Sequence, residues 1–256
     1  MSIAFKQSPL ALVRKLLTRS AYTLRTGYWH TPERCCPDFP DEIFVNQLKV
    51  YRFASQFCMK ARILDVGCGT GYGTSYLAQS AESAVGIDIS SQALGYARKR
   101  YGSSNVEFLR MGAEALIFAD RSFDFIISTE NFEHLRDHHA NLREMSRVLT
   151  DAGVLLLATP NPEMFVGIHN RYHTHEFAFE ELTQIMQEFF CECLIAENLL
   201  VPPTEEGRRL KEDRQKKGEV GVNLALHPSL WGDTIDTTWL SNTHSFFVFA
   251  RHPRRE

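Results

Sequence analysis

A glycine-rich loop framed by acidic residues carries the clearest chemical meaning in this sequence. The glycines of residues 65–71 alternate with other residues, directly after an apolar run and directly before a helical one. Such positions let a backbone approach a ligand closely and adopt positive φ. Asp65 opens this loop, and Asp88 closes the next apolar run, where a carboxylate can accept ribose hydroxyls. The pattern predicts a nucleoside-binding crevice.

The same loop argues against a phosphate ligand. A dinucleotide fingerprint requires a third glycine where Tyr72 stands, and no Gly-Lys-Ser/Thr follows for a Walker loop. Asp65 would also be a poor neighbour for a pyrophosphate. A sulfonium nucleoside with an ammonium group and no phosphate suits the loop better, because Asp65 could approach that ammonium directly or through water. S-adenosylmethionine (SAM) is such a ligand.

Several segments in order resemble the motifs of the class I SAM-dependent methyltransferases. Residues 63–73 resemble the first motif and residues 85–90 the second. Residues 108–116 resemble the adenine-contacting stretch, and residues 123–135 the motif of the fourth strand. The resemblance is close over residues 60–160.

The resemblance implies SAM as the cofactor and a set of residues that bind it. Gly112 departs from the family, which often has an acid there for the adenine amino group, so that role would fall to Glu114 or to the backbone at Ala113. The expected cofactor-binding residues are Asp65, Gly67, Cys68, Gly69, Gly71, Asp88, Ile89, Ala113, Glu114 and Thr129.

Two histidine-bearing segments are candidates for acceptor chemistry. His134 follows the fourth predicted strand, where it would act as a general base or brace the loop beside the cofactor. His173 is the second catalytic candidate, and Tyr172 and His175 beside it would line the acceptor pocket. Trp29 lies in an aromatic-rich stretch that we expect to form a lid over the acceptor, where it would contact the substrate. We expect no metal site, because aromatic and amide neighbours suit acceptor binding as well.

The wider pattern predicts a Rossmann-like, doubly wound α/β fold. Short apolar runs alternate with helical stretches, as in a parallel sheet covered by helices. A helix is expected over 41–57, before the sheet, and the last strand is expected to be antiparallel, with helices on both faces. Seven strands are expected, at 61–66, 83–88, 106–109, 123–128, 154–158, 192–197 and 245–250.

The charge of the chain limits its possible partners, and the distribution of its residues indicates its domains. The net charge of −3 over 256 residues argues against a protein that grips nucleic acid. Residues 1–40 form a basic extension, and 41–256 form the methyltransferase domain with an insertion at about 200–243. Within the extension, residues 1–30 fit peripheral membrane contact, a targeting peptide or a packed helix. A cytoplasmic protein, membrane-associated in the first case, is expected.

The function predicted from these features is methyl transfer from SAM to an oxygen of a small molecule or glycan. A quinone or lipid methyltransferase at a membrane surface is the alternative within the same chemistry. A non-catalytic SAM-binding protein is the alternative from another class, because residues that bind a cofactor do not prove turnover.

Overall fold

The computed structural model describes residues 35–40, 42–162, 170–197 and 245–254. The predicted insertion at 200–243 lies outside these residues, as do most of the predicted N-terminal extension and Trp29. None of the helices described here is long and apolar enough to cross a membrane.

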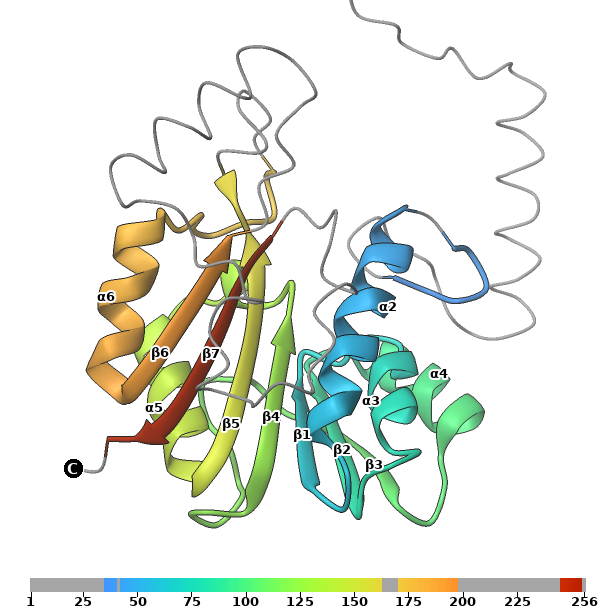
Figure 1. Cartoon of the computed structure of the whole chain (residues 1–256). Helices are drawn as coiled ribbons and strands as arrows, with labels where there is room; N and C mark the ends of the chain where they lie inside the picture. Colours follow the sequence, from blue (N-terminus) through green and yellow to red (C-terminus); the bar gives the residue numbers. More distant parts are fainter. Residues whose placement is uncertain (1–34, 41, 163–169, 198–244, 255–256) are drawn as a thin grey trace, which may run out of the picture.

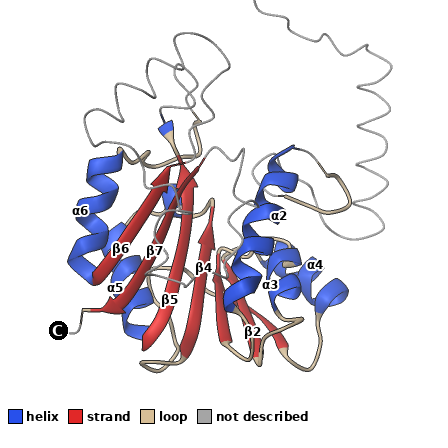
Figure 2. Ribbon diagram, in the orientation of Figure 1, coloured by secondary structure: helices blue, strands red, loops and turns tan. Residues whose placement is uncertain are grey.

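Seven strands form one mixed sheet in the order β3-β2-β1-β4-β5-β7-β6 (Figures 1 and 2). Neighbours from β3 to β5 run parallel, whereas β7 runs antiparallel to both β5 and β6. This confirms the predicted doubly wound sheet with an antiparallel last strand. The strands are β1 Arg62–Val66, β2 Ser83–Asp88, β3 Val106–Arg110, β4 Phe123–Thr129, β5 Leu149–Pro160, β6 Phe190–Glu197 and β7 Ser245–Pro253.

Helices cover both faces of the sheet, as predicted. Helices α2, α3 and α4 lie on one face, and α5 and α6 lie on the other (Figure 1). Side chains cap two of them: Ser90 accepts from the Ala93 N–H at 3.2 Å, and Asp137 accepts from the Ala140 N–H at 2.8 Å. The helices are α2 Glu42–Ala54, α3 Tyr72–Leu77, α4 Ser91–Tyr101, α5 His138–Val148 and α6 Phe179–Phe189, with short 3₁₀ turns η1 Ser55–Phe57 and η2 Phe132–His134.

The strands divide their side chains between two cores. In β4, Ile126 packs into the cluster that contains α5 and α6, whereas Phe125 and Ile127 pack into the cluster that contains α2 and α3. The same alternation runs along β7, where Phe246 and Phe247 point to opposite clusters. Burial on both faces explains why the central strands read as continuous apolar runs in the sequence.

Strand β5 is longer than predicted, because it begins at Leu149 rather than at Val154. Phe123 pairs with Leu149 but Phe125 pairs with Val154, so an irregularity in the ladder takes up the residues between them. The strand order reverses between β1 and β4. In open α/β sheets, ligands bind at the carboxyl ends of the strands beside such a reversal.

Candidate functional site

The glycine loop leaves β1 and turns its amide groups toward β2. The N–H groups of Gly67 and Cys68 both donate to the carbonyl of Ile87 at 2.9 Å. The Gly69 N–H donates to Oδ2 of Asp88 at 3.0 Å. These three donors are therefore already bonded within the protein, unlike the free amides of a phosphate-binding loop.

The three loop glycines have positive φ, but their surroundings differ. A Cβ on Gly71 would lie 2.6 Å from Ala97 and Phe108, and one on Gly67 would lie 2.5 Å from Asn131. A Cβ on Gly69 would meet nothing within 4 Å. Gly71 thus permits close packing at the start of α3, whereas Gly69 lies beside open space.

Asp88 ends β2 and organises the loop. Its Oδ1 accepts from the Ser90 N–H at 2.7 Å, while Oδ2 accepts the Gly69 bond described above. The side chain is buried, yet it lines a cavity of about 640 Å³. Each carboxylate oxygen can accept a further bond, so Asp88 presents hydrogen-bond acceptors to whatever enters that cavity.

Asp65 lies beneath the loop and is not part of the cavity wall. It is fully buried and accepts from Thr74 Oγ1 at 2.6 Å and from the Tyr51 hydroxyl at 3.1 Å. Tyr51 itself lines the cavity and also accepts from Thr129 Oγ1 at 3.4 Å. Tyr51 therefore connects the Asp65 carboxyl to the space that a ligand would enter.

A second set of polar side chains lines the cavity after β4. Glu130 has a φ of +47°, which is uncommon for a residue with a side chain, and its Oε1 accepts from Ser245 Oγ at 2.6 Å. Desolvation raises the pKa of Glu130 to about 7, against the opposing effect of the Ser245 bond. His134 and Tyr172 line the same cavity. The Glu130 carboxyl is therefore a group in the cavity wall that can accept a proton near neutral pH.

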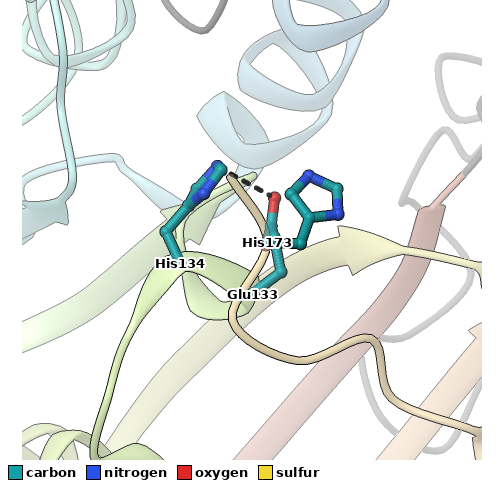
Figure 3. Close-up of side chains that lie close together, drawn as sticks. All are labelled: Glu133, His134 and His173. Carbon is teal, nitrogen blue, oxygen red and sulfur yellow. Dashed lines mark ion pairs between the residues drawn. The ribbon is translucent and has the colours of Figure 1, made fainter. Parts of the chain in front are cut away.

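Hydrogen bonds join the segment that follows β5 to η2. The Thr174 N–H donates to the Glu133 carbonyl at 2.8 Å, and His134 Nδ1 lies 2.9 Å from the Tyr172 carbonyl. The rings of His134 and His173 meet edge to face with centroids 5.0 Å apart (Figure 3). Backbone bonds thus bring together histidines that are distant in the sequence.

The structure places most of the predicted residues at one cavity. His173 is nearly buried behind His134, and His175 is partly exposed and paired with Glu181 at 2.8 Å, so neither lines the cavity. Asp65 and Gly71 also lie outside the lining. The predicted residues in the wall are Gly67, Cys68, Gly69, Asp88, Ile89, Ala113, Glu114, Thr129, His134 and Tyr172.

Some cavity residues were not predicted from the sequence. Gln47 and Tyr51 reach the wall from α2, and Glu130 and Asn131 reach it from the end of β4. Buried Asn141 on α5 donates to the Ala113 carbonyl at 2.8 Å and so positions the stretch after β3. The positions of Glu130 and Asn131 directly after a central strand were the signal that could have found them.

Comparison with known proteins identifies a family model and several relatives that the chain matches. A family described as "Methyltransferase domain" matches residues 64–157. A probable SAM-dependent methyltransferase of Mycobacterium tuberculosis is 32% identical over 162 residues, covering 61% of this chain and 58% of that protein. An O-methyltransferase of Aspergillus nomiae is 32% identical, covering 58% of this chain and 71% of that protein. A demethylmenaquinone methyltransferase of Bacillus velezensis is 30% identical, covering 69% of this chain and 77% of that protein.

The chain belongs to the class I SAM-dependent methyltransferase family. It spans a little under two thirds of the length of several of the curated relatives that it matches. A solved structure shares its fold: phosphoethanolamine N-methyltransferase 2 of Haemonchus contortus, in complex with SAM. The TM-score is 0.55 at 19% identity, and the match covers 82% of this chain and 52% of that one.

The residues of this methyltransferase fit its cofactor SAM, which supplies the methyl group as a sulfonium. Asp88 offers acceptors for ribose hydroxyls, and the open side of Gly69 leaves room beside it. Ala113 and Glu114 line the wall in the segment that follows β3, and their contact with adenine stays a prediction. The ammonium contact predicted for Asp65 stays a prediction, and Tyr51 is the residue through which it would act.

The buried carboxyl of Asp65 gives the methyltransferase a pH-dependent stability. Desolvation raises its pKa from 3.8 to about 7, and the bonds from Thr74 and Tyr51 only partly oppose this. Because the folded pKa lies above the unfolded one, the contribution is complete below about pH 4 and is lost as pH rises through about 7. Relative to Asp65→Asn, we expect the wild-type free energy of unfolding to fall by at most about 1.4 kcal/mol per pH unit across that window.

Urea unfolding of both proteins at about pH 5 and about pH 7 measures this difference. Asp124→Asn provides the control: the side-chain bond from Arg62 lowers the pKa of Asp124, so the contribution of this carboxyl should not change between about pH 5 and about pH 7. A wild-type minus Asp65→Asn difference that is independent of pH would contradict the prediction.

Proposed function

We propose that this methyltransferase transfers the methyl group of SAM to an oxygen of a small molecule or glycan. The observation that carries the proposal is that one cavity is lined by Asp88 and also by His134 and Glu130. Asp88 suits the nucleoside. His134 and Glu130 offer proton acceptors, which an oxygen nucleophile needs and a sulfonium donor does not.

His134 is the proposed base. Its Nδ1 lies 2.9 Å from the Tyr172 carbonyl, and a carbonyl can only accept, so this nitrogen carries the hydrogen in the neutral ring. The lone pair is then on Nε2. In the proposed step the acceptor oxygen bonds to the methyl carbon, the carbon–sulfur bond breaks with its electron pair going to sulfur, and the hydroxyl proton moves to Nε2.

The protein's further contribution is to hold the reactants in line and exclude water, which can supply roughly 7–11 kcal/mol. Tyr51 and Thr129 in the cavity wall are buried and bonded to each other, and Tyr51 is also bonded to buried Asp65, so these contacts hold part of the wall in place. Glu130 is a second proton acceptor in the same wall. Its raised pKa suits proton exchange near neutral pH.

The relatives support both the oxygen acceptor and one alternative. The Aspergillus nomiae protein is named an O-methyltransferase, whereas the Bacillus velezensis protein is named for demethylmenaquinone. The alternative is therefore a quinone or lipid acceptor at a membrane surface. The basic residues 1–30 motivate this alternative, although they lie outside the described part of the chain.

A methyl-transfer panel tests the proposal. The full chain is incubated with methyl-labelled SAM and with sugars, phenols, quinols and fatty acids, and products are identified by mass spectrometry and NMR. We expect methyl ether or ester products from at least one class, and far less product with Asp88→Ala at the same subsaturating cofactor concentration. Products methylated only on carbon or nitrogen would overturn the oxygen assignment. SAM binding without turnover in every class would favour a non-catalytic protein.

A further inference from the structure

Glu133, His134 and His173 form a compact cluster at the edge of the cavity. One ligand atom from each lies within 4.8 Å of the others (Figure 3). Glu133 and His134 come from η2, and His173 comes from the segment that is fastened to η2 by Thr174. Among the residues described, these three side chains bring one carboxylate oxygen and two imidazole nitrogens within 4.8 Å of one another.

The hydrogen bonds of His173 fix which of its nitrogens has a lone pair. The Tyr172 N–H donates to Asn170 Oδ1 at 3.1 Å, so the amide nitrogen of Asn170 is the atom that lies 2.8 Å from His173 Nε2. That amide can only donate, so Nε2 accepts. His173 Nδ1 carries the hydrogen and donates to Glu176 Oε1 at 2.9 Å.

His134 has the same arrangement, with Nδ1 bound to the Tyr172 carbonyl and the lone pair on Nε2. Histidines that bind metals are commonly held in this way, by a carbonyl or carboxylate on the nitrogen remote from the ion. Here a backbone carbonyl holds one ring and the Glu176 carboxylate holds the other. Both Nε2 atoms are therefore oriented by partners outside the cluster.

Glu133 supplies the charge of the cluster. Only 1% of its side chain is exposed, its Oε2 accepts from Thr159 Oγ1 at 3.0 Å, and its Oε1 lies 3.7 Å from His134 Nε2. A buried carboxylate beside two nitrogen lone pairs is an arrangement that a cation stabilises. A proton on His134 is one such cation, and a metal ion is the other.

We propose that Glu133, His134 and His173 bind one divalent transition-metal ion of the zinc type. Two imidazoles and one carboxylate form a ligand set of catalytic zinc sites, which keep a further position for water or substrate. The ion would replace the Asn170 amide at His173 Nε2. Nitrogen ligands favour such an ion over Mg²⁺ or Ca²⁺, which prefer oxygen.

This site goes beyond the proposed function, because it does not depend on which acceptor is methylated. If an ion were held by His134 Nε2, it would lower the pKa of a hydroxyl of the acceptor, and Glu130 in the same wall, in place of His134, would take the proton. The sequence predicts no metal site, and nothing in it indicates that Glu133-His134 and His173 lie together. Their proximity arises from the bonds between η2 and the segment after β5.

Metal titration of the full chain tests the site directly. Protein stripped with a chelator is titrated with Zn²⁺ by calorimetry and with Co²⁺ by visible absorption, without acceptor. We expect one high-affinity ion per chain, with the Co²⁺ spectrum of nitrogen and oxygen ligands. Glu133→Gln and His173→Ala should each weaken binding by at least about 10- to 100-fold, and Glu176→Gln by a similar factor through His173.

His139→Ala is the matched control, because this exposed histidine on α5 pairs with Glu188 at 3.3 Å outside the cluster. Its metal affinity should equal that of the wild type. Binding of SAM to every variant shows that the cofactor cavity has folded, so that a failed metal site does not count against the methyltransferase assignment. Absence of stoichiometric binding, unchanged affinity in Glu133→Gln and His173→Ala, or a Co²⁺ spectrum of thiolate ligands would overturn the proposal.

Discussion

Replacement of Asp88 by alanine is expected to weaken SAM binding by about 100-fold, or about 2.7 kcal/mol. A hydrogen bond to a charged group contributes about 1.5–3 kcal/mol, and Asp88 can accept bonds from both ribose hydroxyls. The alanine also removes the acceptor of the Gly69 N–H, which lies 3.0 Å from Oδ2, and the acceptor of the Ser90 N–H. The loop is thus loosened at the same time as the ribose contact is lost.

Isothermal titration with SAM measures the loss of affinity, and two further variants serve as comparisons. Asp88→Asn keeps the side-chain size and one oxygen acceptor, so we expect an intermediate loss. Glu107→Ala removes an exposed acid from β3 outside the cavity lining, and it should leave the affinity unchanged. An Asp88→Ala protein that binds SAM as tightly as the wild type would remove Asp88 from the cofactor site.

The second large effect is expected at His134. We expect His134→Gln to lower kcat by about 10²–10⁴-fold with whichever acceptor the panel identifies, because a positioned proton acceptor contributes about that factor. The affinity for SAM should change little, because His134 is proposed to contact the acceptor and not the cofactor. Loss of kcat without loss of cofactor affinity is the signature of a group that acts in the chemical step.

Steady-state kinetics with both substrates varied measures kcat, and SAM titration measures the cofactor affinity separately. His139→Gln serves as the control for the removal of a histidine from the same region of the chain. A metal ion at His134 predicts the same loss, but then chelation of the wild type must reproduce it. If kcat for His134→Gln stays within about tenfold of the wild type, His134 only braces the loop.

The sheet could be predicted from the sequence because its signals are local. A strand buried on both faces is a continuous apolar run, and the loop after β1 needs glycine for its backbone conformation. Each segment within residues 60–160 can therefore be predicted from its own residues. The early start of β5 at Leu149 was missed because it depends on pairing with Phe123 across the sheet.

The site was less predictable where it depends on distant contacts. Tyr51 reaches the cavity from a helix that precedes the sheet, and nothing in the order of residues along α2 marks it. His173 was predicted as a catalytic candidate, but its position next to His134 was not predicted. That position follows from the Thr174 bonds to η2. The burial of Asp65 beneath the loop, away from the cavity wall, also depends on packing that no motif encodes.

The bonds from the loop amides to Ile87 and Asp88 have a consequence for selectivity among adenosine compounds. ATP shares its nucleoside with SAM, but at the loop its triphosphate would meet amide donors that are already bonded to Ile87 and Asp88. The hydrogen bonds that shape the turn therefore also discriminate against a polyanion at this loop.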